Sequence, residues 1–171
     1  MQSNVEKFGI SDKRGRRRTH DDPYAPEAGL PGLNICRECH AVYHRKAWKQ
    51  DQELYRESLQ GSYSLTLCPA CQRADENVPQ GFVTLAGAYL NEHRQEIMNG
   101  LQNVVDEAQQ SNPLDRVIRE RKEDDGRLEI ETTTIKLAER LGRALKHSHH
   151  GEMAMTWTGD PPTCRVTWQR D

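Results

Sequence analysis

Two pairs of cysteines have the spacing that binds a metal ion. Two residues separate Cys36 from Cys39, and two separate Cys68 from Cys71. Cysteines spaced in this way, each pair in a tight turn, direct both thiolates at one tetrahedral ion. Four thiolates close the shell and leave no open position, so the sequence predicts one structural Zn²⁺ ion, with iron as the second choice.

Other residues offer weaker sites. His40 and His44 follow the first pair and are read as surface residues, with replacement of a cysteine ligand as the minor alternative. A thioredoxin-like redox pair would need a βαβ unit, which the pattern lacks. Cys164 lies in an alternating segment and is interpreted as a small core or surface residue. A histidine cluster near the C-terminus has no partner ligands in view: His147, His149 and His150.

Basic residues form two clusters that suit phosphate binding. The net charge of the chain is -2, yet six bases and one acid between Lys7 and Thr19 give a local charge of +5. The bases proposed for nucleic-acid contacts there are Lys13, Arg14, Arg16, Arg17 and Arg18.

A second cluster lies between the cysteine pairs and mixes bases with aromatic rings, which suits stacking on bases together with phosphate contacts. Its residues are Tyr43, Arg45, Lys46, Trp48 and Lys49. For the two rings an equally weighted alternative is packing over the metal site, since small metal modules need apolar cover. For the leader, the alternative is a solvated tail without a partner.

Composition and periodicity divide the chain into four segments and predict an α+β fold. Residues 1–33 are expected to form a basic, disordered leader, and residues 34–80 a zinc-ribbon-like module. Residues 81–112 are expected to form a connecting helix, with Thr84 as its N-cap. Residues 113–171 are expected to form an α+β module.

Within that last segment the period of the apolar residues changes from 3.6 to 2 and back. Alternating stretches at 116–122 and 127–133 flank Asp124-Asp125-Gly126, a strong hairpin signal. An amphipathic helix is predicted for residues 135–147, closed by Gly151, and two more strands follow it. The module is therefore predicted as β-β-α-β-β, a helix on an antiparallel sheet.

Several functional classes find no support. No apolar run reaches the roughly 20 residues that cross a bilayer, and the first ten residues lack a signal-peptide core, so a cytoplasmic location is expected. No phosphate-binding glycine loop, nucleophile elbow or His-Glu-x-x-His motif is present, so an enzyme is not expected.

The sequence also resembles a known family. Several stretches resemble a bacterial family of uncharacterised zinc-ribbon proteins. They are Asp22-Pro23-Tyr24, the two cysteine pairs, Tyr43-His44 and Trp48, Gly81-Phe82-Val83-Thr84-Leu85, Leu114-Asp115-Arg116, and Thr133-Thr134 with Ala138, Leu141 and Gly142. That family is remotely similar to the N-terminal part of the archaeal and eukaryotic large-subunit export adaptor named for nonsense-mediated decay. The resemblance implies ribosome or ribosomal-RNA binding by a zinc-containing adaptor, with metal ligands limited to the four paired cysteines.

Two main hypotheses follow for the function, and a third, a zinc enzyme or redox sensor, is disfavoured because the four-thiolate shell is closed. The first is a cytosolic protein that binds the ribosome or ribosomal RNA, with the large subunit as the favoured site. A stress or hibernation role is a further inference that depends on this binding. Its α+β module would contact protein or RNA. The alternative is a protein–protein interaction or regulatory adaptor without nucleic acid. Its contact surface would be the acidic helix at residues 85–110, which lies in a stretch, residues 81–126, with nine acids against five bases.

Overall fold

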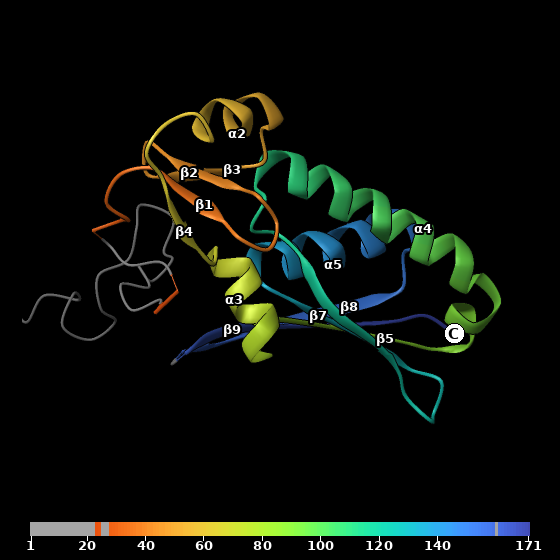
Figure 1. The fold of residues 1–171 in the computed structure, drawn as a ribbon. Coiled ribbons are helices and arrows are strands. Elements are labelled where there is room, and N and C mark those ends of the chain that lie inside the picture. The colour runs from red at the N-terminus through yellow and green to blue at the C-terminus, as the bar shows by residue number, and fades with distance from the viewer. Residues whose placement is uncertain (1–22, 25–27, 160) are drawn as a thin grey trace, which may run out of the picture.

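Two β-sheets and four helices make up the part of the chain described by the structure, a computed structural model that covers residues 23–24, 28–159 and 161–171. Figure 1 shows the smaller sheet, formed by the N-terminal half, beside the larger sheet and its two long helices. No helix among the described residues is both long and apolar enough to cross a membrane.

The N-terminal module is built on a four-stranded sheet with the order β3-β2-β1-β4. Strands β1, β2 and β3 form an antiparallel meander, and β4 pairs parallel with β1. A short helix, α2, connects β3 to β4, and helix α3 follows β4 directly. The bounds are β1 Asn34–Cys36, β2 Val42–His44, β3 Ala47–Lys49, α2 Gln52–Ser58, β4 Ser64–Thr66 and α3 Pro69–Glu76.

The C-terminal module is a five-stranded sheet with the order β6-β7-β5-β9-β8. Its pairs are antiparallel except for β5 and β9, which run parallel. The bounds are β5 Gly81–Ala86, α4 Ala88–Ser111, β6 Val117–Lys122, β7 Leu128–Thr132, α5 Ile135–His149, β8 Glu152–Gly159 and β9 Pro162–Gln169.

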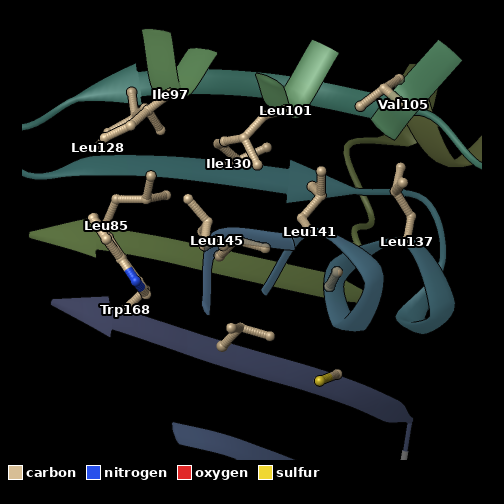
Figure 2. Packing of buried hydrophobic residues seen from close by; sticks show 14 of the residues in the cluster. Leu85, Ile97, Leu101, Val105, Leu128, Ile130, Leu137, Leu141, Leu145 and Trp168 are labelled. Atoms are coloured by element: carbon tan, nitrogen blue, oxygen red, sulfur yellow. The ribbon is translucent and has the colours of Figure 1, made fainter. Parts of the chain in front are cut away.

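Helices α4 and α5 pack on one face of this sheet and enclose the main core (Figure 2). Leucines of α5 recur every four residues and are fully buried, as are the inward residues of the strands. Gly142 lets α5 approach the sheet, because a Cβ there would lie 2.6 Å from Val166 Cγ1. Residues labelled in Figure 2 show the layer: Leu85, Ile97, Leu101, Leu128, Ile130, Leu137, Leu141, Leu145 and Trp168.

The sequence-based prediction fails at residue 81, where a strand stands in place of the expected helix. Residues 81–86 alternate between buried and half-buried positions, and Val83 and Leu85 are fully buried between β7 and β9. Thr84 is therefore a mid-strand residue, and the helix begins at Ala88 after Gly87. Six residues of alternating pattern merged with the helical period that follows them, which concealed the boundary.

The predicted antiparallel sheet is wrong in one pairing. After α5 the chain forms the edge strand β8 and then returns as β9 beside β5, which makes β9 parallel to β5. The predicted hairpin, the amphipathic helix and the last two strands are confirmed, each within a few residues of the expected bounds. Gly151 follows the α5 C-cap with φ of 76°, as predicted for a residue at that position.

Candidate functional site

The first cysteine pair lies in the turn between β1 and β2. Cys36 is the last residue of β1, and its carbonyl accepts a hydrogen bond from the His40 amide at 2.9 Å. The Cys36 amide in turn donates to the Ala41 carbonyl at 2.8 Å. His40 has φ of 60°, a left-handed conformation that reverses the chain after Cys39. The turn thereby holds the two thiols on the same side.

The second pair lies at the start of helix α3, not in a hairpin turn. Cys68 is the N-cap, and its sulfur accepts a hydrogen bond from the Cys71 amide at 3.4 Å. Pro69 occupies the first helical position, where a missing N–H costs nothing. The partial positive charge at a helix N-terminus offsets part of the effect of burial, which disfavours the thiolate forms of both cysteines.

The four sulfur atoms form one cluster. All of them lie within 4.8 Å of one another, and Cys39 Sγ lies 3.7 Å from Cys68 Sγ. Four sulfurs at about 2.3 Å from a tetrahedral ion would be about 3.8 Å apart, so the cluster needs only small adjustments to hold one metal ion. The Cys68 amide also donates to Cys36 Sγ at 3.3 Å, which joins the two pairs.

Electrostatics within the cluster favour a bound cation. A hydrogen bond from Cys68 lowers the pKa of the Cys39 thiol to about 4, and the same contact together with burial raises the pKa of Cys68. Burial and the charge of Cys39 raise the pKa of Cys71 to about 11. One thiolate thus suppresses ionisation of its neighbours, and a divalent ion removes this conflict by neutralising the thiolates together.

Arg116 adds a cation from the C-terminal module. Its Nη1 donates to Cys71 Sγ at 3.3 Å, and its Nε donates to the Pro113 carbonyl at 2.8 Å. Burial opposes its charge, but the thiolates outweigh this and raise the pKa of Arg116 above its usual value. Four thiolates around a divalent ion carry a net charge of −2, which one guanidinium halves. Spacing rules could not reveal this residue, because it lies 45 positions from Cys71.

Apolar side chains cover the four-cysteine cluster, and the predicted aromatic residue Trp48 is one of them. Trp48 and Leu114 are partly buried and pack against the metal cluster. Tyr43 is 7% exposed, and its ring centroid lies 5.3 Å from that of Trp48. The structure therefore favours packing for both rings over base stacking. His40 stacks on Tyr55 at 5.1 Å.

Basic residues predicted to contact nucleic acid project from the β2–β3 hairpin. Arg45 and Lys46 form its two-residue turn, between His44 and Ala47, which face each other across the strands. Both are exposed, and both have left-handed backbones, with φ of 51° and 63°. Lys49 is exposed on β3. The structure thus places three of the predicted bases on the edge of the N-terminal module, which is called the metal module from here on because it contains the four candidate ligands.

The basic run of the leader, Lys13, Arg14, Arg16, Arg17 and Arg18, lies outside the described residues. Described leader residues contact the metal module at two points. The Tyr24 hydroxyl donates to Glu76 on α3, and the Arg73 guanidinium lies 4.3 Å from the Tyr24 ring centroid. The Leu30 amide donates to the Tyr43 hydroxyl at 3.3 Å. The chain that leads to the basic run therefore leaves from the metal module.

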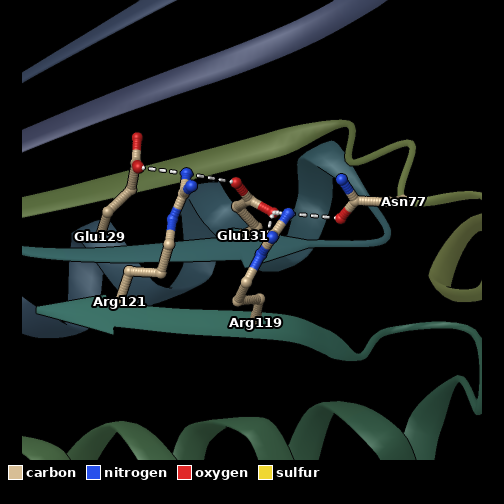
Figure 3. A network of polar contacts seen from close by, with 5 residues as sticks. All are labelled: Asn77, Arg119, Arg121, Glu129 and Glu131. Carbon is tan, nitrogen blue, oxygen red and sulfur yellow. Dashed lines mark hydrogen bonds and ion pairs between the residues drawn. The ribbon is translucent and has the colours of Figure 1, made fainter.

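Arginines on the open face of the larger sheet are engaged in ion pairs (Figure 3). Arg119 pairs with Glu131 at 3.0 Å, and Arg121 pairs with both Glu129 and Glu131 at 2.8 and 2.9 Å. Arg119 also donates to Asn77, the C-cap of α3, so the network connects the two modules. Their carboxylate partners therefore neutralise these two cations locally.

The remaining candidate ligands lie apart from the cluster. Among the described residues, the four cysteines are the single group of three or more such side chains close enough to share an ion. His149 is 8% exposed and contacts the Tyr89 and Trp168 rings, so it belongs to the core. Cys164 is fully buried in β9, as expected for a small core residue.

Fold and site together define a module with four clustered cysteines, which could hold one metal ion, attached to an α+β module. Comparison with models of known protein families, with curated proteins and with solved structures found no match. The argument for function therefore rests on the residues themselves.

Proposed function

We propose that the protein is a zinc-containing cytoplasmic adaptor that binds ribosomal RNA, on the large subunit of the ribosome. Cys36, Cys39, Cys68 and Cys71 would hold one structural Zn²⁺ ion, because four soft thiolates in a tetrahedral arrangement suit zinc. The observation that carries the RNA part is the exposed Arg45–Lys46 tip in a left-handed conformation.

This tip is a costly way to build a hairpin. A two-residue turn with positive φ at both positions favours Asn-Gly, which adopts that conformation easily. L-residues with longer side chains pay roughly 1–2 kcal/mol each in this region. Arg45 and Lys46 have φ of 51° and 63°, so the turn sacrifices stability and places two cations in solvent. Backbone strain of this kind is enriched at functional sites, and paired cations on a protruding turn suit phosphates.

The leader would extend the same contact. Arg18 precedes Tyr24, which contacts Glu76 of the metal module, by six residues, and this limits its distance from that contact to about 22 Å of extended chain. Six bases on such a tether, beside a fixed basic hairpin, suit a polyanion whose phosphates follow one another at regular intervals. A rigid hairpin would set the register, and the tether would add affinity that depends strongly on salt.

Sedimentation of a cell lysate through sucrose gradients at low and high salt tests the proposal. Comigration with the large subunit at low salt and release at high salt are expected. Replacing Arg16, Arg17 and Arg18 with Gln should weaken the association without changing the melting temperature. A matched control, Lys122→Gln with Lys136→Gln and Arg165→Gln, removes three exposed charges of the C-terminal module and should leave binding intact.

Protein that stays at the top of the gradient during both growth and starvation would refute ribosome binding. In that case the exposed acidic residues of α4 support the alternative, a protein adaptor without nucleic acid. They are Glu92, Glu96, Asp106 and Glu107. Pull-down with a charge-reversed α4 as the negative control would then identify the partner.

A further inference from the structure

The two edges of the larger sheet differ in their protection against strand addition. Edge strand β6 contains Arg119, Glu120, Arg121 and Lys122, and its register shifts after Val117. Charges and irregular register are the usual devices that keep an edge from pairing with another chain. The opposite edge, β8, has eight residues in regular antiparallel register with β9 and shows no such shift.

Strand β8 is also nearly free of charge. Glu152 is its single ionisable residue, and from Met153 to Gly159 the strand has neither charge nor proline. Long, uncharged edge strands present unpaired N–H and C=O groups as a template for a further strand. Because the chain protects β6 and not β8, the structure indicates that β8 is the edge kept available for pairing.

An apolar row runs along the helix-facing side of this strand. Met153 and Met155 are half-buried against α5, where their side chains lie close to Gly142. Trp157 continues the row and is 58% exposed, although its indole Nε1 donates to Glu139 at 2.9 Å. An exposed tryptophan at the end of a half-covered methionine row is a common feature of protein interfaces.

We propose that β8 pairs antiparallel with β8 of a second copy of this chain and forms a two-fold symmetric dimer with a continuous ten-stranded sheet. Symmetry restricts the register. A two-fold axis perpendicular to the sheet keeps both helical layers on the same side, so paired residues must point to the same face. Registers centred on a residue satisfy this condition. The register centred on Met155 is chosen because it pairs the three apolar residues of the row with one another, whereas centring on Thr156 would place Met153 opposite Gly159.

In that register, Met153 of each copy lies opposite Trp157 of the other, and the two Met155 side chains meet at the axis. Thioether–aromatic contacts of this kind are favourable. On the open face Ala154 lies opposite Thr156, and Glu152 faces the neutral Thr158. No like charges meet along the strand. This self-complementarity favours a second copy over an unrelated peptide as the occupant.

Analytical ultracentrifugation of the zinc-loaded full chain, under reducing conditions and from about 1 to 100 µM, tests the proposal. A dimer is expected. Ala154→Lys with Thr156→Lys places two cations on the exposed side of the edge and should weaken dimerisation at least tenfold. The matched control, Thr167→Lys with Gln169→Lys, adds the same charge to exposed positions of the neighbouring interior strand β9 and should leave the dimer intact.

Hydrogen exchange of the wild type gives a second readout that does not depend on a variant folding. Amides of β8 should become more protected as protein concentration rises, whereas amides of β6 should not change. A wild type that remains monomeric from about 1 to 100 µM overturns the proposal. This holds even if β8 pairs with an extended peptide from another protein. So does a dimer that survives the edge variant, or one that leaves β8 exchange unchanged. None of these outcomes depends on whether RNA binds.

Discussion

Replacing Arg45 with Asn and Lys46 with Gly is expected to stabilise the protein while weakening its binding to RNA. Both residues have positive φ, at 51° and 63°. Glycine removes nearly all of the penalty at its position and asparagine part of it, a gain of about 1.5 kcal/mol in the free energy of unfolding. For a chain of this size the melting temperature should rise by about 3–6 °C.

The same variant removes two cations from the proposed phosphate contact. If each neutralises one phosphate, the slope of log K against log salt concentration should decrease in magnitude by about 1.4–1.8. Fluorescence anisotropy with a labelled large-subunit rRNA fragment, at several potassium chloride concentrations, measures this slope. Circular dichroism during heating measures the melting temperature of the same samples.

Opposite signs of the two effects make this test informative. Lys49→Gln removes a neighbouring exposed charge from a regular strand, so it should weaken binding without stabilising the fold. If the Asn-Gly variant melts at the same temperature or lower, the argument from backbone strain is wrong. If it gains stability and binds RNA as well as the wild type, the tip is not the contact surface.

Four further predictions concern the metal site and the core. Cys68→Ser should abolish stoichiometric zinc binding and amide protection in the N-terminal module, while hydrogen exchange still reports protection in the C-terminal core. Arg116→Gln should let a chelator remove zinc about tenfold faster, because the guanidinium no longer offsets the thiolate charge. Gly142→Ala should lower the free energy of unfolding in urea by about 1–3 kcal/mol, because the new Cβ would lie 2.6 Å from Val166 Cγ1. Burial, followed by the charge of Glu139, raises the pKa of Cys164 to about 11 from 9.0, so stability should decrease as pH rises from 9 to 11, and less so in Cys164→Ala.

Local patterns predicted those parts of the fold that depend on near neighbours. The Asp124-Asp125-Gly126 turn between alternating stretches predicted the β6–β7 hairpin, and the leucine spacing of residues 135–147 predicted α5. The pairing of β5 with β9 joins residues about 83 positions apart, and no local signal encodes it. Likewise the strand at residues 81–86 is specified by burial between two later strands, which the sequence does not show at that position.

The metal site shows the same division. Spacing of the four cysteines predicted the cluster, because two short turns are enough to converge their sulfurs. The position of the second pair at a helix N-terminus was not predicted, since a Cys-Pro start is compatible with either a turn or a helix. Arg116 and the strained conformation of the hairpin tip arise from tertiary contacts and backbone geometry, and residue type reveals neither.

The segment at residues 112–116 explains how a chain with 35% hydrophobic residues holds its two modules together. The Arg116 side chain contacts Cys71, while its backbone amide donates to Thr133 Oγ1 at 2.9 Å. The adjacent Asp115 is 2% exposed and accepts from Thr134, whose hydroxyl also caps α5. Charge at the metal centre and the cap of a core helix are therefore joined through consecutive residues. Polar contacts of this kind require a defined geometry, so they fix the orientation of the metal module without a large apolar interface.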